Sequence, residues 1–129
     1  MLTARRLVAR IAPRVADAWP AILAIALAVV LAHSGVLHLR DAGDLAQHYR
    51  DILGFDAART VGIAQLVAAG GLCFAATRVV TCTAFAALLV IAIANQALSG
   101  RLDWATVTTA CVLAWTIAIA WGEARRTAV

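Results

Sequence analysis

Four long apolar runs, separated by short polar segments, organise this chain. They cover roughly residues 20–39, 61–77, 79–98 and 105–121. Each run has the length that a helix needs to cross a hydrocarbon core about 30 Å thick at 1.5 Å per residue. The pattern therefore predicts an all-α integral membrane protein built as a four-helix bundle. The turns around Arg78 and at residues 99–103 are very short, so spans two to four are expected to be sequential antiparallel neighbours.

The polar segment between the first two runs contains a second kind of pattern. Within residues 44–53, apolar and polar side chains separate onto two faces at helical spacing, and Gly54 is a plausible stop. We expect a short amphipathic helix here, lying flat on the outer surface and covering the mouth of the bundle. Its apolar face would hold Leu45, Tyr49, Ile52 and Leu53, opposite Gln47, His48, Arg50 and Asp51.

Residues 1–18 form a basic amphipathic segment before the membrane domain of residues 19–122. Arg6, Arg10 and Arg14 recur every four residues beside an apolar stripe. This suits a cytoplasmic helix on the inner leaflet with its guanidinium groups among phosphates, and Pro13 is expected to kink or break it. A frayed tail is the alternative. The Arg-rich start also resembles a signal peptide, but the apolar run continues to Leu39, which favours a retained span. Residues 123–129 would be a cytoplasmic tail.

Composition and charge agree with a membrane protein and give it an orientation. The chain is 64% hydrophobic and 14% charged, and all eleven basic residues are arginine. With four spans, seven arginines fall on the side of both termini and four on the other. The positive-inside rule then places both termini of this multi-pass protein in the cytoplasm. The arginines form no long run or aromatic-studded face, so nucleic acid is not an expected partner.

Polar side chains within the predicted spans gather at one level of the membrane, near its outer side. His33 is the most informative of them, because an ionisable ring inside an apolar run normally faces a bundle interior or a wet cavity. The other spans supply amides and hydroxyls at a similar depth. The candidate ligand-binding residues are His33, Ser34, Gln65, Asn95, Gln96 and Thr109.

Two interpretations of this polar level remain open. In the first, the polar groups hydrogen-bond one another and fix the helix register. In the second, they line an outward-facing pocket for a quinone head group, a flat guest that arrives through the bilayer and needs donors at its oxygens. A histidine ring could also exchange protons with that guest. Catalytic residues, if there are any, are not indicated.

Haem, metal and disulfide chemistry are less well supported by the pattern. All three histidines (His33, His38 and His48) come from the first span and the loop after it, so no second helix supplies a matching haem ligand. Neither a His-x-x-His nor a Cys-x-x-Cys pair is present, and no metal site or covalently bound cofactor is expected. Cys73, Cys82 and Cys111 are expected to be small buried apolar residues.

The segments AHSGVLHLRD, DLAQHYRDILGF and RTVGIAQLVAAGGLCFAATR, followed by two spans with tight turns, resemble the DoxX and MauE superfamily of small bacterial membrane proteins. The resemblance covers about residues 21–121 and implies four helices in a bacterial cytoplasmic (inner) membrane. It also implies a redox setting, either quinone-linked or thiol-linked, and work beside a membrane or periplasmic partner. In that superfamily the second span typically begins with an acid, and here the corresponding residue is Gln65. This departure removes the one carboxylate that might transfer protons.

Taken together, the pattern and the resemblance predict the DoxX-like membrane subunit of a redox system, with a quinone-type site or docking surface near the outer leaflet. The alternative is an accessory subunit without chemistry that fills a helix interface in a larger membrane complex. Both interpretations include the lipid bilayer and other membrane or periplasmic subunits as partners.

Overall fold

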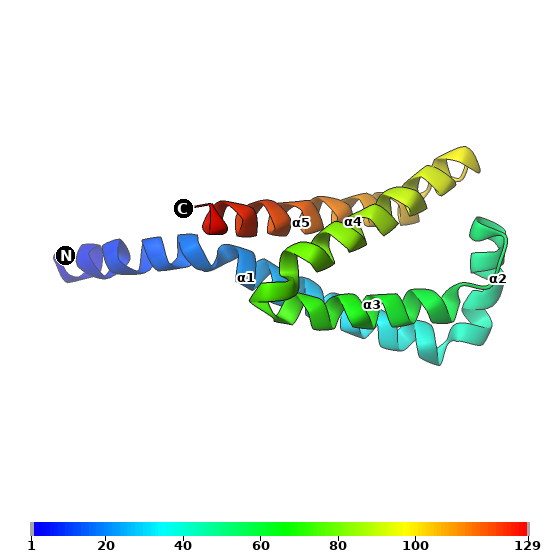
Figure 1. Cartoon of the computed structure of the whole chain (residues 1–129), viewed down its shortest axis with the longest axis horizontal. Helices are drawn as coiled ribbons and strands as arrows, with labels where there is room; N and C mark the ends of the chain where they lie inside the picture. The colour runs from blue at the N-terminus through cyan, green and yellow to red at the C-terminus, as the bar shows by residue number, and fades with distance from the viewer. Residues whose placement is uncertain (1, 129) are drawn as a thin grey trace.

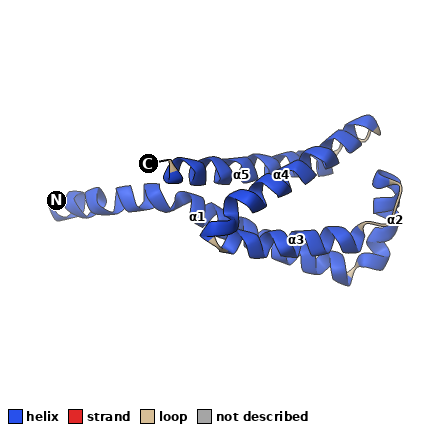
Figure 2. Cartoon of the chain, viewed as in Figure 1, coloured by secondary structure: helices blue, strands red, loops and turns tan. Residues whose placement is uncertain are grey.

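The chain folds entirely into helices joined by short loops (Figures 1 and 2). The computed structural model describes residues 2–128, except for the side chains of residues 2, 3, 52 and 53. No strand occurs among the residues described. The five helices are α1 (Leu2–Arg40), α2 (Ala42–Leu53), α3 (Ala58–Cys73), α4 (Ala75–Leu98) and α5 (Trp104–Thr127).

Three of these helices, α1, α4 and α5, are long and apolar enough to cross a membrane. The predicted second span corresponds to α3, which is apolar but only 16 residues long. It ends at Cys73 because Phe74 adopts an extended backbone, and the last predicted residues of that span belong to α4. In addition, α5 continues to Thr127, so most of the predicted C-terminal tail is helical.

The first helix is continuous for 39 residues and contains both Pro13 and Pro20. Of the expected kink or break at Pro13, the break is therefore wrong. The helix continues through this proline, although its ring leaves the carbonyl four residues earlier without an intrahelical donor. Residues 4–17 are exposed and project beyond the rest of the molecule (Figure 1).

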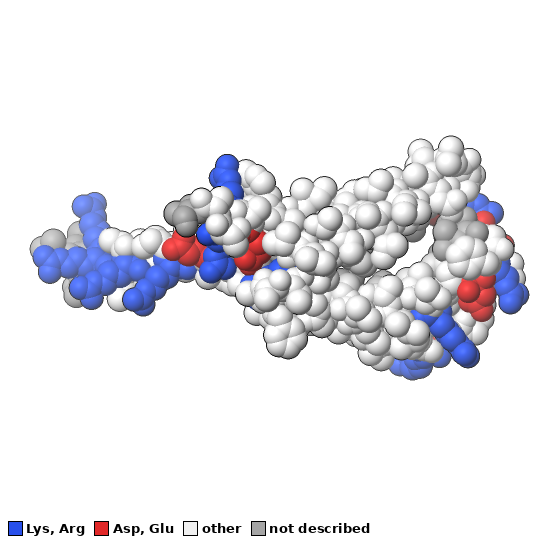
Figure 3. Space-filling model, in the orientation of Figure 1, with Lys and Arg blue, Asp and Glu red and all other residues white. Residues whose placement is uncertain are grey.

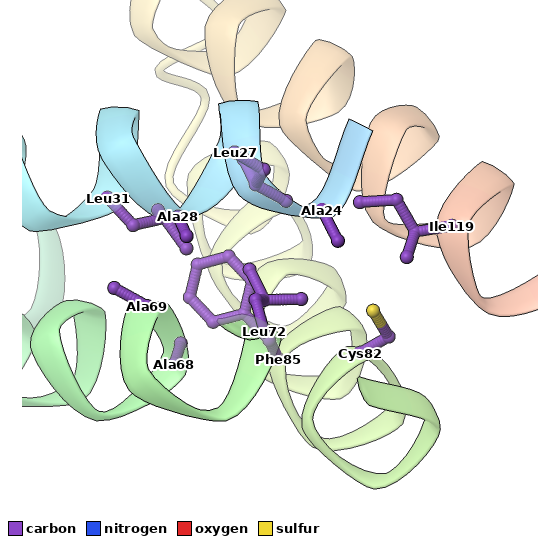
Figure 4. Close-up of a cluster of buried hydrophobic side chains, with 10 residues drawn as sticks. All are labelled: Ala24, Leu27, Ala28, Leu31, Ala68, Ala69, Leu72, Cys82, Phe85 and Ile119. Carbon is purple, nitrogen blue, oxygen red and sulfur yellow. The ribbon is translucent and has the colours of Figure 1, made fainter. Parts of the chain in front are cut away.

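The remaining helices form two arms that meet at one end. The first arm consists of α1, from Pro20 onward, and α3; the second consists of α4 and α5 (Figure 1). Leu27, Leu72 and Ile119 are fully buried where the arms meet, and Figure 4 shows them within one apolar cluster. We call this end, marked by Trp19, Arg78 and Glu123, the closed end.

Glycines allow the closest helix contacts. In the first arm, a Cβ built on Gly35 would lie 2.9 Å from the carbonyl oxygen of Gly62, so α1 and α3 approach backbone to backbone. At the closed end, a Cβ built on Gly122 would lie 2.5 Å from the Trp19 ring, so α5 crosses α1 there. Trp115 also joins these two helices, because its Nε1 donates to the carbonyl of Leu23 at 3.1 Å.

Away from the closed end the arms diverge, and we call the far end, marked by Arg40 and Leu98, the open end. Figure 3 shows a visible gap between the arms there. Helix α2 lies across this end and touches α1, α3 and α4. The predicted amphipathic helix and its stop are confirmed: Gly54 has a φ of 79°, and its N–H donates to Arg50. The predicted apolar contributions of Ile52 and Leu53 lie outside the described side chains.

Candidate functional site

The inner faces of the helices carry polar groups toward the open end. On α4 the side chains that face the inside recur at helical spacing through Arg78, Cys82 and Phe85, and Gln96 continues this series. On α3, Gln65 lies on the same face as the buried Gly62, Ala69 and Leu72. Gln65 lies midway along α3 and Gln96 lies two residues before the end of α4, so the two amides lie on inner faces in different arms.

Three other predicted site residues are half-buried. Ser34 follows Leu27 and Leu31 on the inner face of α1. Thr109 precedes the buried Thr116 on α5 at heptad spacing, and its hydroxyl donates to the carbonyl of Ala105 at 2.8 Å. Asn95 is half-buried beside Gln96.

His33 differs from the rest, because its ring is exposed on the outer side of α1. It follows the buried Leu31 by two residues, which is about 200° around a helix. Its depth in the membrane follows from its position along the run, whereas the direction of the side chain depends on helical phase. Among the described residues, none hydrogen-bonds the His33 ring, and the histidine on the inner face is His38.

His38 and Tyr49 form a hydrogen-bonded pair at the open end. The distance from His38 Nε2 to Tyr49 Oη is 2.6 Å, and His38 Nδ1 lies 2.8 Å from the carbonyl oxygen of Ser34. A carbonyl only accepts, so Nδ1 carries the proton and Nε2 accepts from the tyrosine hydroxyl. This pair joins α1 to α2. The sequence pattern did not predict it, because His38 entered only as a possible haem ligand and as part of the resemblance.

Within the part of the chain that the structure describes, two carboxamide oxygens on the inner faces are buried and have no hydrogen-bond partner. They are Oε1 of Gln65 and Oε1 of Gln96, and the latter residue is only 8% exposed. A buried acceptor without a donor costs roughly 1–3 kcal/mol, so such groups usually mark a site for a water or ligand. A carboxamide can present either a donor or an acceptor to a guest, which suits a ligand that changes between carbonyl and hydroxyl forms.

An apolar groove runs between the arms on the surface where α3 faces α4. Its volume is about 430 Å³, within the range of small-molecule sites. Thr60 lies at one end and Thr81 farther along, and the rest of the lining is mostly aliphatic. Lining side chains include Ile63, Val67, Val80, Phe85 and Leu88. In a membrane this groove would be open to lipid chains.

The closed end holds a buried ion pair. Arg78 Nη1 lies 3.0 Å from Glu123 Oε1, and Arg78 Nε donates to the carbonyl of Leu72 at 2.8 Å. Arg126 is a more distant partner of the same carboxylate, at 3.7 Å. In the sequence, Arg78 served only to predict the orientation of the chain in the membrane, and Glu123 was expected in the cytoplasmic C-terminal tail. The pair joins the end of α3 to α4 and α5, so its arrangement is structural.

The cysteines and acidic groups offer less. Cys82 is buried in the apolar cluster, as expected, but Cys73 and Cys111 are exposed, so the expectation of burial is wrong for these two. All three are free thiols. Among the residues that the structure describes, no group of three or more His, Cys, Asp or Glu gathers in one place.

Comparisons with models of protein families, with curated proteins and with solved structures find no match to this chain.

Proposed function

We propose that this chain is the membrane subunit of a redox system and holds a quinone-type guest between its arms near the open end. The observation that carries the proposal is the pair of buried, unpartnered carboxamide oxygens of Gln65 and Gln96 on inner faces of the two arms. A quinol would donate a hydroxyl to one of these oxygens, and the oxidised form would accept from the same amide after a flip. The proposed site binds the quinone, and no residue is assigned a catalytic role.

The apolar groove between α3 and α4 supports a guest with a hydrocarbon tail. It is open to the surrounding lipid and lined mostly by aliphatic side chains. A tail lying in this groove would approach the interior between the arms from the bilayer, and its head would meet polar groups only toward the open end. His38 and Tyr49 join α1 to α2 at that end, and their hydrogen bond offers a proton-exchanging pair beside the guest.

The proposal includes a topology. All four helices α1, α3, α4 and α5 would cross a bacterial inner membrane, with α3 as the shortest crossing and the open end outside. Seven arginines then lie with the termini on the cytoplasmic side. Charged side chains concentrate at the two ends of the molecule and leave its middle uncharged, as a bilayer requires (Figure 3). Membership of the DoxX and MauE superfamily is part of the same proposal, through the sequence motifs that resemble it.

A quinone retained during purification would test the proposal. The chain is purified from bacterial membranes in gentle detergent, and the quinones extracted from it are quantified per mole of protein. The test variant is Gln65→Leu/Gln96→Leu, and Thr108→Val is the control, because this exposed hydroxyl donates only to its own helix at Trp104. We expect near-stoichiometric quinone in the parent and control chains and a severalfold loss in the test variant. Equal background amounts in all three would contradict the proposal.

A further inference from the structure

The outer face of α1, opposite the apolar cluster, carries a heptad repeat. Five β-branched residues recur every seventh position, and all are between 52% and 65% exposed. They are Val8, Val15, Ile22, Val29 and Val36. Three residues after each of them comes a second apolar position, in the series Ile11, Ala18, Ile25, Ala32 and Leu39. Ala18 and Ala32 are half-buried, and Ala32 also packs against the apolar cluster, so this second series lies at the edge of the face. This arrangement of a and d positions is that of a two-stranded parallel coiled coil, in which β-branched residues are favoured at a.

The repeat extends beyond the part of α1 that would cross the membrane. From Ile22 to Val36 an exposed apolar face is expected of any membrane-crossing helix. However, the repeat continues in the same register through Val8, Ile11 and Val15, in the part of α1 that projects beyond the arms (Figure 1). The projecting part of α1 is thus apolar on the same side as the part that packs in the first arm, and one partner helix packed along α1 would cover both.

The projecting part also has a surface depression that a side chain of a partner helix would fill. Val8, Ile11, Ala12 and Val15 border a shallow apolar depression. Their spacing of three, four and seven residues is that of the hole that receives one side chain of a facing helix. The arginines leave this depression clear: Arg6 and Arg10 lie on the far side of α1, whereas Arg5 and Arg14 flank it.

His33 gives an independent reason for a protein neighbour within the membrane. Its exposed ring lies at the edge of the same face, four residues after Val29 and three before Val36. A titratable ring facing hydrocarbon is unfavourable, and histidines in spans almost always face protein or water. A helix packed along Val29 and Val36 would cover one side of this ring.

We propose that the occupant of this face is a second copy of α1, packed in parallel about a two-fold axis normal to the membrane. Parallel packing about such an axis brings each β-branched residue against its own counterpart, so one sequence supplies both sides of the interface. From Val8 to Leu39 the face is about 45 Å long and roughly 10 Å wide, so two copies would bury on the order of 1,000 Å². Twice 45 Å by 10 Å is about 900 Å², close to the area of about 1,000 Å² expected of a biological interface.

Disulfide cross-linking in native membranes tests the dimer. In full-length chains whose three cysteines are replaced by alanine, Val15→Cys and Val29→Cys each place a thiol at an a position. Ala9→Cys on the side of α1 and Ile91→Cys on α4 are the matched exposed controls. After mild oxidation we expect severalfold more disulfide-linked dimer from both valine variants than from their controls. Quinone retention is measured on the same samples, so a failure of the dimer is distinguished from a failure of the guest site.

Three results would overturn the proposal. Equal cross-linking of the valine variants and controls would show that this face meets lipid. Strong cross-linking at Val15 alone would show that the copies meet only outside the membrane. A dimer mass that persists in the variant Val8→Asp/Val15→Asp/Val29→Asp, measured in detergent by light scattering, would place the contact on another face.

Discussion

The guanidinium of Arg78 and the carboxylate of Glu123 lie 3.0 Å apart, and each side chain is only 7% exposed. The two residues are far apart in the sequence and meet where α3 ends, α4 begins and α5 leaves the apolar cluster. Arg78 also donates to the carbonyls of Leu72 and Cys73, which the end of α3 leaves without intrahelical donors. The ion pair thus closes one end of the molecule, while the arms separate toward the other.

Removing one partner of this pair should strongly destabilise the fold. Glu123→Ala leaves the buried guanidinium without its counter-ion, which typically costs about 3–5 kcal/mol. Unfolding in mixed micelles with increasing denaturing detergent, followed by circular dichroism, measures the change. Replacing both partners by apolar residues, Arg78→Met/Glu123→Leu, should recover much of the loss. The exposed Arg101→Met should change stability by less than about 0.5 kcal/mol. If Glu123→Ala were as stable as Arg101→Met, a structural role for the ion pair would be contradicted.

The contact between Gly35 and Gly62 should tolerate no side chain. Gly35→Ala would place a Cβ 2.9 Å from the Gly62 carbonyl oxygen and from Leu66 Cγ, so the backbones of α1 and α3 must move apart. We expect a loss of about 1–3 kcal/mol, as in other overpacked sites. Gly70→Ala is the matched control in α3, because nothing lies within 4 Å of the position that its methyl group would take. It should stabilise the helix by about 0.5–1 kcal/mol. If Gly35→Ala and Gly70→Ala changed stability in the same direction, the close packing of Gly35 on Gly62 would be contradicted.

The two glycines of α2 should respond to alanine in opposite directions. Gly54 ends the helix with a φ of 79°, a left-handed conformation that costs an alanine roughly 1–2 kcal/mol. Gly43 lies within the helix with open space around it, so Gly43→Ala should stabilise α2 by about 0.5–1 kcal/mol. Hydrogen exchange of the amides of residues 45–51 reports both changes. Slower exchange in Gly54→Ala would show that the residue does not end the helix.

Tyr49 should titrate above the ordinary range of tyrosine. Burial raises its pKa from 10.0, because the phenolate is poorly solvated. It is the only tyrosine in the chain, so its ultraviolet absorbance reports one group. The folded pKa exceeds the unfolded one, so the stabilisation is complete below pH about 10 and is lost as the pH rises through the folded pKa. Tyr49→Phe should flatten this alkaline loss of stability. A folded midpoint at or below 10 would contradict the burial of the hydroxyl.

Much of the fold follows from local patterns in the sequence. Apolar runs predict α4 to its last residue, Leu98, and the separation of polar and apolar side chains with Gly54 predicts α2 and its end. The helix does not break at Pro13, because a proline weakens a helix without always ending it. The length of α5 was underestimated because Glu123 looks like the start of a polar tail. Its carboxylate is buried only because Arg78, far away in the sequence, reaches it.

The candidate site could be predicted by depth but not by direction. Counting along the runs placed Gln65, Gln96 and Thr109 toward one end, and the structure brings them onto inner faces. His33 and His38 lie five residues apart, and only their phase relative to Leu31 decides which ring faces inward. The bond between His38 and Tyr49 depends on how α2 folds back, which no local pattern specifies.

Photolabelling with an azido-substituted benzoquinone tests the central claim, a guest site between the arms, most directly. The protein is reconstituted into lipid nanodiscs and irradiated with the probe, and the modified residues are mapped by mass spectrometry. We predict labels concentrated near Gln65, Gln96 and Tyr49, which excess unlabelled quinone removes. Labels spread evenly over lipid-facing residues such as Val29 and Ile117, and unchanged by that competitor, would contradict a site between the arms.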